Sequence, residues 1–137
     1  MRILGLDLGT VRIGMAISDE TETLASGRGF YERRTREEDM EFFRSLVHDE
    51  VIGKIVLGFP VNMDGTLGPK AEETIEFKEA LEEILEVPVE LHDERLTTSE
   101  AERVLIDANV SRKKRKGIVD QQAAVLILQG YLDQQAR

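Results

Sequence analysis

The sequence has no cysteine and only two histidines among its 137 residues. Without cysteine, the protein cannot form disulfide bonds, zinc–thiolate sites or a cysteine nucleophile. His48 and His92 are too few for a metal site built from imidazole ligands. Any metal ion in this protein must therefore be held by oxygen, for which the 27 Asp and Glu residues are the main source.

Long hydrophobic runs and an excess of positive charge are also missing. No stretch approaches the ~18 apolar residues that span a membrane, and the N-terminus lacks the features of a secretion signal. We therefore expect a soluble, cytoplasmic protein. The net charge of −9 argues against non-specific coating of nucleic acid, which depends on Lys and Arg. The sequence RKKRK at 112–116 is a local exception and suits a local contact.

The first third of the chain has the pattern of an antiparallel meander. ILGLDLG (3–9) reads as a fully buried strand, and apolar residues alternate with period two in the strand at 11–19. A weaker third strand follows at 23–33, where Gly27 and Gly29 interrupt the pattern.

Helices and strands alternate in the rest of the chain. We expect a helix at 36–50, a strand at 54–60, a helix at 69–86, a strand at 87–93 and helices at 97–108 and 118–137. This alternation is typical of parallel strands joined by crossovers. It places the loop 61–69 before the second helix and RKKRK in the loop between the last two helices. The sequence therefore predicts one α/β domain over residues 1–137, with a mixed five-stranded sheet flanked by helices.

Asp7 is a carboxylate inside the apolar strand sequence ILGLDLGT (3–10). An unpaired buried carboxylate costs several kcal/mol even after relaxation, so its charge must be compensated. Two more acids adjoin a strand end or apolar sequence: Glu94 follows the strand VPVELHD, and Asp120 begins the last predicted helix. If the first and fifth strands are neighbours and the last helix packs across their ends, the three carboxylates converge.

Three converging carboxylates would form an oxygen-only site for Mg²⁺ or Mn²⁺. Two such ions ~3.5–4 Å apart activate a water and stabilise the leaving oxygen of a displacement at phosphorus, and no histidine base is needed. The cations would also supply the counter-charge that Asp7 needs. The predicted chemistry is hydrolysis of a phosphodiester bond.

Each acid taken alone also has a structural interpretation. Asp7 can be hydrogen-bonded to neighbouring strands, Glu94 can be a solvated acid or a partner of Arg95, and Asp120 can favour the positive end of a helix dipole. RKKRK can be a solvated loop, although Asp120 follows it by four residues and cations there would meet approaching phosphates. The combination of the three acids favours the functional interpretation.

Four motifs in the sequence resemble the YqgF (RuvX) family of Holliday-junction-resolvase-like proteins, which are regarded as nucleases of ribosomal RNA precursors. In chain order the motifs are LDLGTVRIGMAISD, GFPVNMDGTLGPKA, DERLTTSEAE and SRKKRKGIVDQQAAVLILQGYL. The resemblance runs nearly end to end and implies an RNase H-like fold. It also implies metal-binding catalytic roles for Asp7, Glu94 and Asp120.

The first functional interpretation is a metal-dependent endo- or exonuclease that uses Mg²⁺ or Mn²⁺, with two ions expected. By resemblance, its substrate is structured RNA, namely the 5′ end of the precursor of small-subunit ribosomal RNA. The residues expected to hold substrate are Arg12, Asn62, Arg95, Lys113, Lys114 and Arg115.

Three alternatives stay open at this point. A Holliday-junction resolvase acting on branched DNA needs a symmetric pair of sites and therefore a dimer, so monomer and dimer are both open. The DLGT turn also resembles the phosphate loop of sugar kinases and actin-like ATPases, which enclose the nucleotide between two such domains. A non-catalytic RNA-binding factor in ribosome assembly would bind RNA equally well without the three acids.

Overall fold

The computed structural model describes residues 1–93 and 112–136, with side chains described for residues 1–93 and 121–136. Five strands and three helices are described. The strands are β1 (Arg2–Leu8), β2 (Arg12–Ser18), β3 (Ala25–Glu32), β4 (Ile52–Phe59) and β5 (Val89–Asp93). The helices are α1 (Arg36–Asp49), α2 (Pro69–Ile84) and α4 (Arg112–Gln135).

The strands form one mixed sheet in the order β3-β2-β1-β4-β5. β1, β2 and β3 are antiparallel neighbours, whereas β1, β4 and β5 are parallel neighbours, which confirms the predicted meander and crossovers. The condition that the first and fifth strands are neighbours is not met, because β4 lies between β1 and β5. β4 has four consecutive buried residues, 55–58, and takes an inner position, while β5 has solvent-exposed residues and forms an edge.

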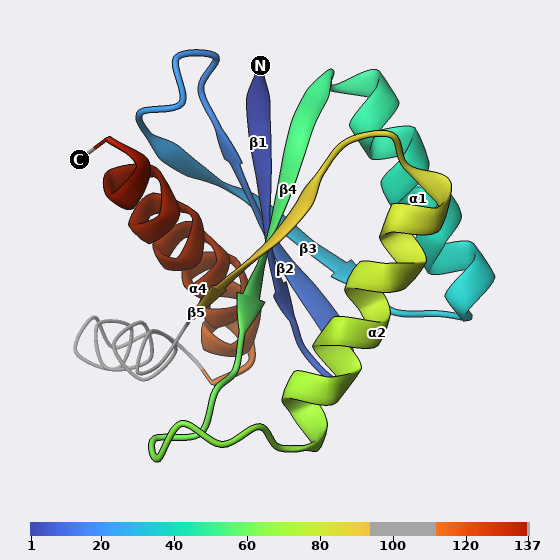
Figure 1. Ribbon diagram of the computed structural model, residues 1–137, viewed down its shortest axis with the longest axis vertical. Coiled ribbons are helices and arrows are strands. Elements are labelled where there is room, and N and C mark those ends of the chain that lie inside the picture. The colour runs from blue at the N-terminus through green and yellow to red at the C-terminus, as the bar shows by residue number, and fades with distance from the viewer. Residues whose placement is uncertain (94–111, 137) are drawn as a thin grey trace.

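Helices cover both faces of the sheet: α1 and α2 pack on one face and α4 packs on the other (Figure 1). On the α4 face, Ile3 and Val56 contact a buried stripe of the helix that includes Ile127 and Leu128. Gly5 allows this helix to approach closely, because a Cβ atom there would lie 2.8 Å from Cβ of Leu128. The position of α4 is therefore determined by its contacts with the central strands β1 and β4.

Helix α4 begins at Arg112, so the prediction that RKKRK forms a loop is wrong. Arg and Lys are good helix formers, and the helix continues through Gly117 although glycine costs ~1 kcal/mol in a helix interior. The packing of the later turns on the sheet offsets that cost. The helix predicted at 97–108 lies outside the described residues.

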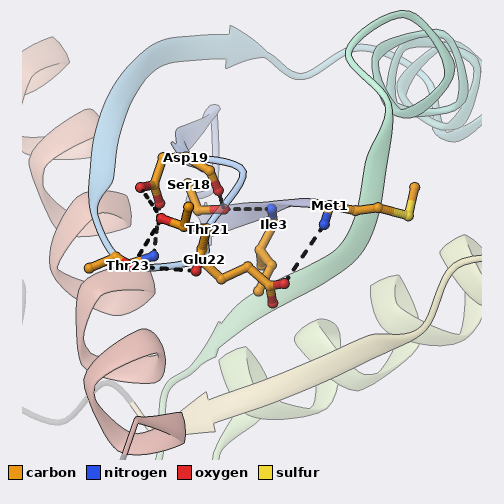
Figure 2. Close-up of polar contacts among 7 residues, drawn as sticks. All are labelled: Met1, Ile3, Ser18, Asp19, Thr21, Glu22 and Thr23. Atoms are coloured by element: carbon orange, nitrogen blue, oxygen red, sulfur yellow. Dashed lines mark hydrogen bonds and ion pairs between the residues drawn. The ribbon is translucent and has the colours of Figure 1, made fainter.

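The turn between β2 and β3 is held by side-chain hydrogen bonds at the end of the sheet where β1 begins (Figure 2). The Ser18 hydroxyl accepts from the backbone N–H of Ile3 at 2.8 Å. The Asp19 carboxylate accepts from the Thr21 hydroxyl at 2.6 Å and from the Thr23 N–H at 2.8 Å. These donors, with the Thr21 hydroxyl foremost, lower the pKa of Asp19 to about 2.

No helix in the described part of the chain is both long and apolar enough to cross a membrane.

Candidate functional site

Asp7 lies one residue before the carboxyl end of β1, at the centre of a row of residues that crosses the whole sheet. It pairs with Gly14 of β2, and Gly14 pairs with Phe30 of β3. On the other side, Gly58 continues β4 just beyond its last pair with β1, and it pairs with His92 of β5. Residues in register share a face of the sheet, which here is the α4 face. We call Phe30, Gly14, Asp7, Gly58 and His92 the Asp7 row.

Asp7 has no side chain beside it on either neighbouring strand, because both of its neighbours in the row are glycines. Gly14 and Gly58 are buried, whereas Asp7 is half-buried. The expectation that this strand is fully buried is therefore wrong at Asp7. Asp7 is therefore a partly exposed carboxylate whose two neighbours in the row carry no side chains.

Of the other two predicted acids, the structure describes only the backbone of Asp120. Glu94 directly follows Asp93, the last residue of β5, and Glu94 and Arg95 lie outside the described residues. The backbone at Asp120 is helical and lies in α4, but its side chain is not described. Within the described part of the chain, no three Asp, Glu or His side chains are grouped closely enough to hold a metal ion. The three-carboxylate site stays a prediction.

Two glutamines attach α4 to strand β3, at the edge of the sheet. The Gln121 side-chain oxygen accepts from the backbone N–H of Gly29 at 2.7 Å. Two turns later, the Gln129 oxygen accepts from the N–H of Ala25 at 2.9 Å. These two hydrogen bonds fix the position of α4 along β3, and they therefore also fix the position of the backbone at residue 120. The sequence analysis did not single out either glutamine, although their spacing of eight residues places both on one helix face.

Arg33 joins the turn after β1 to helix α2. Its guanidinium donates to the Gly9 carbonyl and to the Glu73 carboxylate, each at 2.8 Å, and its side chain is only 16% exposed. The hydrogen bond from Arg33 is the main reason that the pKa of Glu73 is lower than usual. Since Gly9 is two residues after Asp7, this bridge holds the turn beside the candidate site. The sequence analysis missed Arg33, because its partners are 24 and 40 residues away.

The predicted substrate residues in the described part lie on three elements. Arg12 opens β2, and its guanidinium carbon lies 4.8 Å from the ring centroid of Phe30. Asn62 is exposed in the loop between β4 and α2, where its side-chain amide donates to the Thr66 hydroxyl at 3.1 Å. Lys113, Lys114 and Arg115 belong to the first turns of α4, and their side chains are not described.

His92, at the end of the Asp7 row, packs against α4. Its ring meets the Tyr131 ring edge to face, with centroids 6.2 Å apart, and burial lowers the pKa of His92. His92 therefore has a packing role at the end of β5. Tyr131 also donates to the Glu90 carboxylate and accepts from Lys54 at 2.8 Å, so β4, β5 and α4 are joined at this point.

Comparison with known proteins shows the family of the chain. Residues 1–134 match the RuvX family, described as Holliday junction resolvase. The chain belongs to the RuvX family. A RuvX relative from Halothermothrix orenii is 53% identical over 135 residues, covering 98% of this chain and 96% of its own. One from Bacillus subtilis is also 53% identical over 135 residues, covering 97% and 98%. Both relatives carry the name "Putative pre-16S rRNA nuclease".

Solved structures show that this RuvX chain has the fold of RuvC-like resolvases, which is RNase H-like, as predicted. The fowlpox virus resolvase, solved with Holliday junction DNA, matches with a TM-score of 0.63 at 13% identity and covers 100% of both chains. RuvC from Thermus thermophilus, also solved with a Holliday junction, matches with a TM-score of 0.56 at 14% identity and covers 99% and 96%. At these identities the likeness concerns the fold alone.

Proposed function

We propose that this RuvX protein is a metal-dependent nuclease whose site consists of Asp7, Glu94 and Asp120. Membership of the family and the names of its relatives support nuclease activity. The observation that carries the proposal is the place of Asp7, a half-buried carboxylate between two glycines near the carboxyl end of a central strand. Ligand sites of α/β sheets tend to lie at this end of the strands.

The packing of α4 supports the place of Asp120 in the site. The helix runs antiparallel to β1, because Gln129 contacts the start of β3 and Gln121 contacts its later part. A Cβ atom on Gly5 would lie 3.4 Å from the Ala124 carbonyl oxygen. Residue 120 lies four residues, or ~6 Å, before Ala124 along the helix, and Asp7 lies two residues, or ~6.6 Å, after Gly5 along the strand. Residue 120 is therefore expected at the level of Asp7.

In the corrected strand order, β5 lies two strands from β1, and Glu94 follows the last residue of β5 in the chain. Two strand spacings amount to ~10 Å, and the strand between them carries only Gly58 in the Asp7 row. Carboxylates that reach over this glycine from both sides would hold two divalent ions, the arrangement used for displacement at phosphorus.

The donor set suits Mg²⁺ or Mn²⁺, since it consists of hard carboxylate oxygens in a protein without cysteine. A bound ion would supply the positive charge that activates water and stabilises the leaving oxygen. The protein side chains would hold and orient that charge beside the phosphate. Arg12 and Asn62, together with Arg95, Lys113, Lys114 and Arg115, would bind phosphates along the strand.

The proposed substrate is the precursor of 16S ribosomal RNA near its 5′ end, processed in the cytoplasm, in line with the names of the relatives. The test incubates precursor RNA and a four-way DNA junction with the protein in Mg²⁺, Mn²⁺ or chelator. We expect metal-dependent cleavage of the RNA, and loss of cleavage by a factor of about 10³ or more in Asp7→Asn, Glu94→Gln and Asp120→Asn, with RNA binding largely kept. Asp49→Asn, an exposed acid at the end of α1, is the matched control.

Normal cleavage by all three carboxylate variants would contradict the proposed site. Binding of RNA without cleavage, unchanged in the variants, would instead support a non-catalytic assembly factor. The family description favours one further candidate, a junction resolvase that acts as a dimer. Preferential cleavage of the junction, together with a dimeric mass in solution, would support it.

A further inference from the structure

Phe30 is an exposed aromatic residue on the same face of the sheet as Asp7. It is 42% exposed, and it is the one aromatic among the exposed large hydrophobic residues in the described part of the chain. Tyr31, the next residue, instead stacks on Phe42 in the core on the opposite face. Phe30 is therefore exposed because it lies on the α4 face of β3, whereas Tyr31 lies on the opposite face and is covered by α1.

The register of the sheet fixes the distance between Phe30 and the candidate site. Phe30 pairs with Gly14, and Gly14 pairs with Asp7, so the two residues are two strands apart in the Asp7 row. Two strand spacings are ~10 Å. Gly14, which lies between them, is buried and carries no side chain. At this distance, the base next to a nucleotide held at Asp7 can reach Phe30.

Arg12 adds a cation to this aromatic surface. Its guanidinium carbon lies 4.8 Å from the Phe30 ring centroid, which is the geometry of a cation–π pair. Proteins that bind single strands use such surfaces, because unpaired bases stack on aromatic rings and on guanidinium planes. A base within a duplex is already stacked on its neighbours and cannot do so.

We propose that Phe30 and Arg12 form a stacking platform for one unpaired base of the substrate, next to the nucleotide that is cut. This inference rests on the proposed nuclease function and narrows its substrate to nucleic acid that is single-stranded beside the cleavage position. Phe30 is the stacking surface, and Arg12 both supports the ring and supplies charge near the phosphates.

A protein partner that adds a strand to β3 is the competing explanation for an exposed residue on this edge. Such a partner needs the outward backbone N–H groups of the strand. Two of them are already used, since the N–H groups of Ala25 and Gly29 donate to Gln129 and Gln121. The edge is therefore partly closed to strand addition, while the Phe30 side chain itself is exposed.

The test measures binding in chelator, so that no cleavage occurs, with a fluorescently labelled single-stranded RNA and a blunt RNA duplex. We expect Phe30→Ala to weaken binding of the single strand about tenfold and to change duplex binding less than about twofold. Phe30→Trp should keep the affinity, whereas Phe30→Leu, which keeps an apolar side chain without a ring, should lose it. Leu24→Ala, at an exposed apolar residue just before β3, is the matched control.

A base analogue gives a readout that a structural role would not change. 2-Aminopurine in the single strand is expected to be quenched on binding to the wild-type protein and to Phe30→Trp, and to stay bright with Phe30→Leu. If the wild type binds the single strand and Phe30→Leu binds it equally well with equal quenching, the stacking platform is wrong while the nuclease proposal stands. If the wild type neither binds nor cleaves nucleic acid, both proposals fall.

Discussion

Gln121 on α4 accepts a hydrogen bond from the backbone N–H of Gly29 on β3, and its side chain crosses the place where Gly27 would carry a Cβ atom. That Cβ atom would lie 2.3 Å from the Gln121 side-chain carbon Cδ, which is too close for two atoms that are not bonded. The contact lies one residue after Asp120. It therefore controls how the proposed catalytic turn of the helix sits on the sheet.

Gly27→Ala is expected to displace the Gln121 side chain and to break its hydrogen bond to Gly29. The free energy of unfolding should fall by about 0.5–1.5 kcal/mol, the usual net value of one hydrogen bond, and cleavage should fall because residue 120 shifts. Chemical denaturation and a cleavage assay measure the two effects. In a Gln121→Ala background the same substitution should cost much less stability, since no side chain is then displaced. Equal costs in both backgrounds would contradict this account.

Arg33→Ala is expected to release the turn after β1 from helix α2. Its guanidinium donates to the Gly9 carbonyl and the Glu73 carboxylate, and hydrogen bonds of charged groups are worth about 1.5–3 kcal/mol. We expect a loss of unfolding free energy of about that size, together with a lower kcat for cleavage. Arg34→Ala is the control, because Arg34 is exposed and pairs only loosely with Glu38 at 3.9 Å. Similar stability losses in the two variants would contradict the bridging role of Arg33.

The Asp19 turn is expected to make stability depend on pH in the acid range. The pKa of Asp19 is about 2 in the folded chain, against an ordinary value of 3.8. Because the folded value is the lower one, the unfolded chain binds the proton more readily, and the stabilisation present above pH ~4 is lost as pH falls towards 2. Thermal unfolding of Asp19→Asn between pH 2 and 7 should therefore show a weaker pH dependence than the wild type. Glu20→Gln, at the next position, removes the same charge and should leave the wild-type dependence in place.

The basic turns of α4 are expected to contribute salt-dependent binding. Replacing Lys113, Lys114 and Arg115 by glutamine should weaken RNA binding and reduce the slope of log K against log salt by about 2, since each phosphate contact to a single strand contributes about 0.7. Binding titrations at several salt concentrations measure the slope. Phe30→Ala should leave the slope unchanged, because stacking releases no counterions. Lys78→Gln on α2, on the opposite face of the sheet, removes a lysine charge away from the proposed interface and is the control for the position of the charge. An unchanged slope in the triple variant would show that these three side chains do not contact RNA phosphates.

Local periodicity was enough to find most of the secondary structure. The alternation in β2 and the apolar run of β4 depend only on neighbouring residues, so the sequence places these strands to within two residues of their observed bounds. The same reasoning selected Asp7, because a carboxylate within an apolar strand is visible without a structure. It failed at 112–116, where a run of like charges reads as a loop although its residues favour a helix.

By itself, the sequence determined most elements of the described part of the chain, the family and one acid of the candidate site, since these depend on local pattern and on motifs read along the chain. Only the tertiary structure decided that β4 separates β1 from β5, that Gln121 crosses Gly27, that Arg33 joins Gly9 to Glu73 and that Phe30 shares a row with Asp7. The physical reason is that each of these relations joins residues far apart in the chain. Strand order, register and helix packing bring them together, and those depend on how the whole core is filled.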